Sequence, residues 1–293
     1  ADNSVSSGVT RVGGVVVNGW DVVGSISSSA IGRTEWHTAP SLSIDWHIGR
    51  RLFAYFRIAQ GKRAGGLSVV SSGATFTAQK FRTDRLLSRE LGLRFGQQDK
   101  DRFWFSSAVS YATWHNVQAD LIEENGLPYT TNIGDGYIYG LEARGGWTPF
   151  HDLDVTAAMF LNKSTLSAPA AAFINDEGNT LPNVAKAGAY GELSYTLAFN
   201  AHTSLTLNGA VRYVGPSRLG VGSLFDSTQG NYVSSAAGIR LARHKLGFSL
   251  NIDNIANVRA NQFAFGNPFG ISIENQVTPL RPRTIRFGID GAF

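Results

Sequence analysis

The chain has 293 residues, of which 33 are glycine and none is cysteine, and its formal net charge is +4. The lack of cysteine excludes disulfides, thiolate metal sites and cysteine nucleophiles. Only 16% of the residues are charged, no Lys/Arg cluster indicates a nucleic-acid-binding face, and no apolar run approaches the roughly 18 residues of a membrane helix.

Alternating apolar and polar residues predict β-strands along most of the chain. Two β-rich runs at residues 12–17 and 20–28 flank Asn18-Gly19, which is a strong hairpin signal. The same alternation recurs in eleven further segments, at residues 42–48, 52–58, 90–95, 103–111, 141–147, 153–162, 193–199, 205–213, 233–241, 246–252 and 283–293. We therefore expect about thirteen strands, or twelve if residues 12–28 form one long strand.

Very short turns alternate along the chain with long connections rich in glycine, asparagine and proline. The long connections fall near residues 30–39, 61–85, 115–135, 163–186, 215–232 and 257–282, and residues 1–10 would be the remnant of another. Such loops are uncommon in compact soluble domains. Transmembrane barrels have short periplasmic turns and long extracellular loops. The sequence thus predicts an all-β protein, a transmembrane antiparallel β-barrel, over residues 1–293.

The last strand has a strongly apolar face. Ile285, Phe287, Ile289 and Phe293 alternate with polar or small residues, so lipid would cover one side and the lumen the other. Ending on Phe293 is similar to the C-terminal signal by which the barrel-assembly machinery recognises outer-membrane barrels. We expect these four residues to form that assembly signal.

The number of strands bears on whether the barrel is complete. The last strand follows a long loop, so it would run from the outside to a periplasmic C-terminus. Thirteen strands would then place the N-terminus outside, whereas a complete single-chain barrel has an even number of strands and both ends inside. We therefore expect the C-terminal portion of a larger barrel, while twelve strands would allow the chain to close alone.

Five segments, in order along the chain, resemble TonB-dependent outer-membrane receptors. They are FAYFRIAQGKRAGG at 53–66, SRELGLR at 88–94, NIGDGYIYGLE at 132–142, NIDNIANV at 251–258 and PRTIRF at 282–287. The resemblance implies a 22-stranded barrel plugged by an N-terminal domain, and active import of a scarce ligand such as a ferric siderophore or another large nutrient. It implies no enzymatic reaction and no cofactor. Because nothing in these residues resembles the plug or the TonB-binding motif, we expect a partner polypeptide carrying the plug and the remaining strands.

Charges on the polar side of the strands are candidate site residues. A charge facing lipid would cost about 2–4 kcal/mol near the midplane, so these side chains should face the lumen. They would pair with one another and with the plug, or their arginine excess would bind a carboxylate-bearing ligand. The candidates are Arg57, Glu90, Arg94, Glu142, Arg144, Arg212, Arg240 and Arg286.

Aromatic residues in the predicted outer loops could form a vestibule for the ligand or pack on the barrel rim. They are Trp114, Tyr129, Phe225, Phe263, Phe265 and Phe269. The six histidines show no metal-binding spacing, and no nucleophile elbow or phosphate loop is present. The alternatives are an autotransporter translocator, a self-contained porin-like barrel and a soluble β-sandwich.

Overall fold

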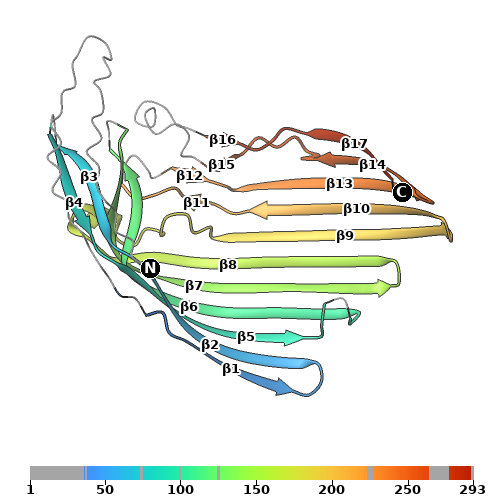
Figure 1. The fold of residues 1–293 in the computed structure, drawn as a ribbon, viewed down its shortest axis with the longest axis horizontal. Helices are drawn as coiled ribbons and strands as arrows, with labels where there is room; N and C mark the ends of the chain where they lie inside the picture. The colour runs from blue at the N-terminus through green and yellow to red at the C-terminus, as the bar shows by residue number, and fades with distance from the viewer. Residues whose placement is uncertain are drawn as a thin grey trace, which may run out of the picture.

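The computed structural model describes residues 36, 38–72, 75–98, 100–123, 126–222, 227–263 and 277–291. Its main element is an 11-stranded sheet in which each strand pairs antiparallel with its neighbours (Figure 1). The strands, in their order across the sheet, are β1 (Ser41–Ile48), β2 (Leu52–Arg63), β5 (Asp84–Phe95), β6 (Phe103–Ile122), β7 (Pro128–Phe150), β8 (Leu153–Pro169), β9 (Ala187–Asn200), β10 (Thr203–Val214), β13 (Tyr232–Arg243), β14 (Leu246–Asp253) and β17 (Thr284–Gly291).

Smaller elements lie at one end of this sheet, within the long connections (Figure 1). They are the hairpin of β3 (Gly66–Ser72) and β4 (Thr75–Phe81), the 3-10 helix η1 (Ala171–Asp176), the pair of β11 (Ser217–Arg218) and β12 (Thr228–Gln229), and the pair of β15 (Asn261–Phe263) and β16 (Thr278–Pro279). We call this the long-loop end and the opposite one the short-turn end. No helix among the described residues is long and apolar enough to cross a membrane.

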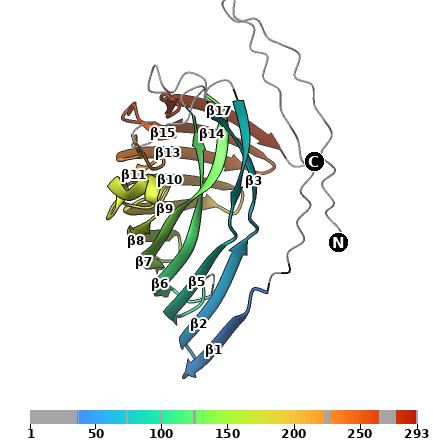
Figure 2. The ribbon, with the colours of Figure 1, turned by 90° about the vertical axis from the view of Figure 1, so that its left-hand side faces the viewer.

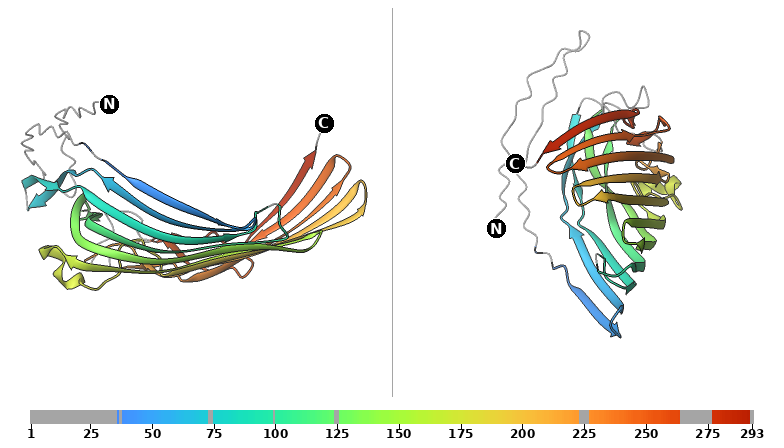
Figure 3. Two further views of the ribbon diagram at one scale, coloured as in Figure 1. Left: turned by 90° about the horizontal axis from the view of Figure 1, so that it is seen from below. Right: turned by 90° about the vertical axis from the view of Figure 1, so that its right-hand side faces the viewer.

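The sheet curls into a trough, with β1 and β17 at its two margins (Figures 2 and 3). Within the described part of the chain, β1 pairs only with β2, and β17 only with β14. The outer edge of each strand therefore carries backbone N–H and C=O groups that would need a further strand, since an exposed edge is a template for pairing. The fold is that of a curved segment of barrel wall.

All eleven alternating segments from residue 42 onward form strands of this one sheet, in the predicted order. The prediction of an all-β antiparallel barrel wall is confirmed. The hairpin expected at residues 12–28 lies outside the described residues, so the total of thirteen strands stays a prediction. Phe293 lies outside them as well.

Several strands continue into segments expected as long loops. β6 has 20 residues and β7 has 23, so the pair reaches well into the connection near 115–135. Likewise β2 extends to Arg63, β5 starts at Asp84, and the β3–β4 hairpin occupies much of what lies between them. In the β6 extension the alternation continues through Val117, Ala119 and Leu121, which are buried in the cluster of loop residues described below.

Cross-strand register gives the sheet two chemically distinct faces. One row on the outer face consists of Phe56, Leu91, Val109, Leu141 and Leu161 on five adjacent strands. The side chains of this face are unusually exposed for apolar groups; Phe287 is 82% exposed. Because a soluble protein rarely exposes a large contiguous apolar patch, this face requires an apolar partner. The opposite, polar face is called the inner face below.

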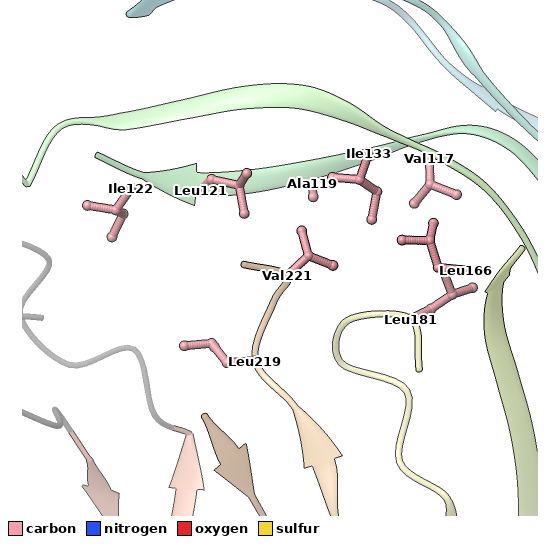
Figure 4. Close-up of a cluster of buried hydrophobic side chains, with 9 residues drawn as sticks. All are labelled: Val117, Ala119, Leu121, Ile122, Ile133, Leu166, Leu181, Leu219 and Val221. Atoms are coloured by element: carbon pink, nitrogen blue, oxygen red, sulfur yellow. The ribbon is translucent and has the colours of Figure 1, made fainter. Parts of the chain in front are cut away.

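The buried hydrophobic core of the protein lies at the long-loop end of the sheet. Ile133, Leu166 and Leu181 are fully buried, and they pack with side chains from β6 and the β10–β13 connection (Figure 4). The remaining members of this cluster are Val117, Ala119, Leu121, Ile122, Leu219 and Val221. The loops therefore form one packed cap, since burying such side chains stabilises it by about 1.5–3 kcal/mol each.

A buried carboxylate joins the cap to the sheet. Asp84 is 2% exposed. Its Oδ2 accepts hydrogen bonds from Arg63 Nε at 2.8 Å and Trp114 Nε1 at 3.0 Å. The Arg63 Nη2 also donates to the Gln118 carbonyl at 3.0 Å. Three strands are thereby held together where the loops leave the sheet.

We expect Asp84→Ala to loosen the cap without unfolding the barrel wall. The change leaves Arg63 and Trp114 donors without their acceptor, which costs about 1–3 kcal/mol locally. Hydrogen exchange should become faster at residues 63–66 and 82–85, and the β3–β4 hairpin should be cleaved faster by protease. Asp154→Ala, which removes an exposed carboxylate that accepts from Thr148 at the short-turn end, is the matched control. Unchanged protection in Asp84→Ala would contradict the role of this carboxylate.

Candidate functional site

A cavity of about 470 Å³ lies on the inner face, lined by residues from β2 through β10. A single cavity can touch strands so far apart in the sheet only on its concave side. Five of the eight predicted lumen charges line it, namely Glu90, Arg94, Glu142, Arg144 and Arg212. The polar face therefore lines the inside of the trough, and strand register brings these five together.

Tyrosines hold two of the carboxylates on the inner face. The Tyr55 hydroxyl donates a hydrogen bond to Glu90 Oε1 at 2.6 Å, and the Tyr190 hydroxyl donates to Glu192 Oε2 at 2.7 Å. The Arg94 guanidinium stacks 5.0 Å from the centroid of the Tyr55 ring. Tyrosine thus satisfies carboxylates that arginine could otherwise neutralise.

The arginines of the cavity form a row. Arg94, Arg144 and Arg212 occupy one cross-strand register on β5, β7 and β10. Among the described residues, none of the three forms an ion pair with a carboxylate, although Arg144 lies 5.9 Å over the Trp104 ring. Guanidinium groups bind carboxylate and phosphate bidentately. The row therefore offers an anion three guanidinium groups that form no ion pair with a described carboxylate.

The other predicted charges are placed differently. Arg57 lines a neighbouring cavity of about 430 Å³ together with Glu90 and Arg94. Arg240 Nη2 lies 2.5 Å from Asp290, and Arg286 Nη2 lies 2.8 Å from Asp253, at the C-terminal margin of the sheet. These last two arginines form intramolecular ion pairs and are not among the residues that line the cavity.

The predicted vestibule aromatics that can be placed belong to the cap. The Trp114 indole donates a hydrogen bond to Asp84, and the Arg63 guanidinium lies 5.4 Å from the centroid of the Trp114 ring. Tyr129 packs against the buried cluster; burial, followed by the negative charge of Glu123, raises the pKa of its phenol. Phe263 belongs to β15, while Phe225, Phe265 and Phe269 lie outside the described residues.

Three of the four residues predicted to form the assembly signal, Ile285, Phe287 and Ile289, lie on the outer face of β17. Ile285 is 55% exposed and Ile289 76%, and Phe287 lies between them with the same orientation. No group of three or more potential metal ligands occurs within the described ranges.

Sequence reasoning missed Tyr55, Tyr190 and the glycines beneath the inner-face aromatics. A Cβ on Gly92 would lie 2.2 Å from the Tyr55 ring, so the ring lies flat against the sheet there. Trp104 lies over Gly146 and Phe160 over Gly188 in the same manner. One sequence signal could have identified Tyr55 and these glycines. In each case a glycine lies directly opposite an aromatic residue on the neighbouring strand.

We expect Gly92→Ala to displace the Tyr55 ring from Glu90 while leaving the strands paired. The added methyl group would overlap the ring, and the freed Glu90 could then neutralise Arg94. A crystal structure of the variant should show the Tyr55–Glu90 hydrogen bond broken, and affinity for an anionic ligand should fall several-fold. Gly61→Ala, at an inner site with nothing within 4 Å, is the control. A Tyr55 ring in its original position would contradict this account.

Comparison with known proteins decides the family. The sequence model of the family "TonB dependent receptor-like, beta-barrel" matches residues 5–255. The chain belongs to the TonB-dependent receptor β-barrel family. No curated protein matches the chain.

Solved structures with the same fold include receptors and transporters. The ferric yersiniabactin uptake receptor FyuA from Yersinia pestis has a TM-score of 0.68 at 20% identity, over 86% of this chain and 37% of that one. BauA, the ferric preacinetobactin receptor from Acinetobacter baumannii, has a TM-score of 0.64 at 16% identity, over 86% and 36%. The copper transporter OprC has a TM-score of 0.63 at 14% identity, over 86% and 39%. This chain therefore spans less than half the length of these structures.

Family membership fixes the surroundings of the two faces. TonB-dependent receptor barrels lie in the bacterial outer membrane, so lipid contacts the outer face and the inner face lines the lumen. The apolar partner that the outer face requires is therefore the bilayer. The match also favours a receptor barrel over the autotransporter, porin-like and sandwich alternatives.

Proposed function

We propose that this chain is the C-terminal barrel portion of a TonB-dependent receptor that imports a ferric siderophore or a comparable large anionic nutrient. The row of Arg94, Arg144 and Arg212 in the lumen cavity, which form no ion pair with a described carboxylate, supports this proposal most directly. A ferric siderophore carrying carboxylate or catecholate oxygens presents anionic oxygens that guanidinium groups bind well. FyuA and BauA, which share the fold, are described as ferric siderophore receptors.

We further propose that a second polypeptide completes the barrel and supplies the plug and the contact with TonB. The two sheet margins, β1 and β17, support this, because no further strand of the described residues pairs with them and every backbone polar group within a bilayer must be paired. In this arrangement the long-loop end faces the medium and the short-turn end the periplasm, with the C-terminus periplasmic and the N-terminus outside. The lumen charges would contact the plug as well as the ligand.

Isolation of the native complex tests whether a second polypeptide accompanies this chain. The protein is extracted from outer membranes without denaturation, and the complex is examined by intact mass and N-terminal sequencing. We expect a co-purifying polypeptide that carries a plug sequence and further strands. A homogeneous chain of this length that refolds alone into a closed, heat-resistant barrel would overturn the two-polypeptide proposal.

Uptake tests the ligand class. Cells grown under iron starvation are given a radiolabelled ferric siderophore, with and without this gene and with and without TonB. We expect accumulation that requires both. Accumulation that persists without TonB would contradict active import, and induction by a carbon source with no response to iron would point to a different nutrient.

A further inference from the structure

Two histidines from different hairpins meet at the short-turn end of the sheet. His202 lies in the turn between β9 and β10, and His244 lies in the turn between β13 and β14. Their ring centroids are 4.6 Å apart, and the two ring planes are inclined by only 20°. The pairing of β10 with β13, in which Thr203 lies opposite Arg243, brings the two turns side by side (Figure 1). Spacing along the sequence therefore gives no sign of this pair.

The backbone holds the two turns in a fixed relation. The His244 amide donates a hydrogen bond to the His202 carbonyl at 2.7 Å. The His202 amide donates in turn to Asn200 Oδ1 at 2.9 Å. The ladder of β9 and β10 also shifts its register between Thr203 and Ser204, and such irregularities re-aim side chains at the end of a strand. Main-chain contacts thus set the positions from which the two rings project.

His244 adopts a left-handed backbone conformation, with a φ of 52°. Every other described residue with a positive φ is asparagine or glycine. Glycine would adopt this conformation at no steric cost. A histidine in such a position points to a role for its side chain, since sparsely populated backbone conformations gather at functional sites.

The ring nitrogens of the pair are available to a ligand. His202 and His244 are both exposed, and no ring nitrogen of either forms a hydrogen bond with another described residue. His151, at a third short turn, differs because its Nδ1 lies 3.2 Å from Asp152 Oδ1. Neither member of the pair lines the lumen cavity, so the pair is separate from the candidate ligand site.

The separation of the two rings fits adjacent positions around a tetragonal metal ion. A metal–nitrogen bond of about 2.0 Å places the ring centre about 3 Å from the metal, so two rings at a right angle have centres about 4.5 Å apart. At the tetrahedral angle the centres would be about 5 Å apart. The observed 4.6 Å matches the right angle. Because both rings are exposed, rotation about the broad χ2 torsion can turn one nitrogen of each toward a shared ion.

We propose that His202 and His244 together bind a divalent transition-metal ion, that copper(II) is the preferred ion, and that water completes its coordination. Imidazole is a good ligand for copper, square-planar or tetragonal geometry is typical of copper(II), and copper(II) binds a given set of ligands more tightly than zinc does. The adjoining cations Arg243 and Lys245 repel a dication, which limits the affinity. The bound ion would join two hairpins at the short-turn end, and the proposal does not depend on the import proposal.

Copper titration tests this proposal on the receptor purified from outer membranes with every polypeptide that accompanies it. The complex is first washed with a chelator and then titrated calorimetrically with copper(II) and, separately, with zinc(II). The electron paramagnetic resonance spectrum of the copper complex counts its nitrogen ligands. The variants are His202→Gln and His244→Gln, and His151→Gln, which removes a histidine from another short turn, is the matched control. Heat-dependent migration in gels verifies that each variant is folded.

We expect wild-type protein to bind copper(II) with a two-nitrogen spectrum and more tightly than zinc(II). Either pair variant should weaken copper binding by at least about tenfold, because a second ligand already in place acts at high effective concentration. His151→Gln should bind as the wild type does. Folded pair variants with wild-type affinity, a one-nitrogen spectrum, or an equal loss in His151→Gln would overturn the proposal. Zinc binding as tight as copper binding would overturn the assignment of a tetragonal ion.

Discussion

Replacing Arg94, Arg144 and Arg212 together by glutamine is expected to abolish high-affinity binding of an anionic ligand. The three guanidinium groups line one lumen cavity and have no carboxylate partner among the described residues. Removing each charge-assisted hydrogen bond should weaken binding by about tenfold, so the triple variant should bind at least about a hundredfold more weakly. Equilibrium titration of the purified receptor with a ferric siderophore gives the affinity directly.

The matched control for that experiment removes three arginines elsewhere. Arg50, Arg102 and Arg243 lie at or beside the short turns, away from the cavity residues. Changing these three to glutamine lowers the net charge equally but should leave affinity within about twofold. If both triple variants bind equally weakly, long-range charge explains binding. If neither variant binds more weakly, the arginine row does not hold the ligand.

The second large effect concerns a charge placed against lipid. Leu93 is 41% exposed on the outer face of β5, between the exposed apolar residues Leu91 and Phe95. Leu93→Arg should destabilise the membrane-embedded barrel by about 2–4 kcal/mol. Urea-dependent unfolding in lipid vesicles, followed by heat-dependent gel migration, measures this destabilisation.

An arginine added to the opposite face should be tolerated. Ser110 faces the lumen on β6 and lies opposite Glu90 in the ladder. Ser110→Arg should change the free energy of unfolding by less than about 1 kcal/mol, because the new charge is hydrated and lies beside a carboxylate. Equal destabilisation by Leu93→Arg and Ser110→Arg would contradict the assignment of the two faces.

The sheet could be predicted from sequence because lipid and lumen impose a strict period of two. In β8, for example, Met159 and Leu161 share the outer face, while Ala158 and Phe160 face the lumen. The same parity predicted which charges point inward, and register then brought Arg94, Arg144 and Arg212 into one row. Register across six strands is set by turn lengths and bulges, so a single sequence does not reveal that row.

The packing of the cap could not be predicted from the sequence, for a different reason. In the part of β6 beyond Trp114, Val117, Ala119 and Leu121 are buried on one side, and loops distant in sequence cover that side. Trp114, a predicted vestibule residue, donates a hydrogen bond to the buried Asp84. Loop-to-loop packing depends on interactions between segments far apart in the chain, which local periodicity does not encode.

Cysteine accessibility along β7 tests most directly the central claim that lipid wets one face and water the other. Because the chain contains no cysteine, Leu141→Cys, Glu142→Cys, Ala143→Cys and Arg144→Cys each introduce a single reporter. In native outer membranes, a charged water-soluble maleimide should label positions 142 and 144, and only a lipid-soluble maleimide should label 141 and 143. If the charged reagent labels all four positions, or if its labelling does not alternate between neighbouring positions, the assignment of the two faces is contradicted.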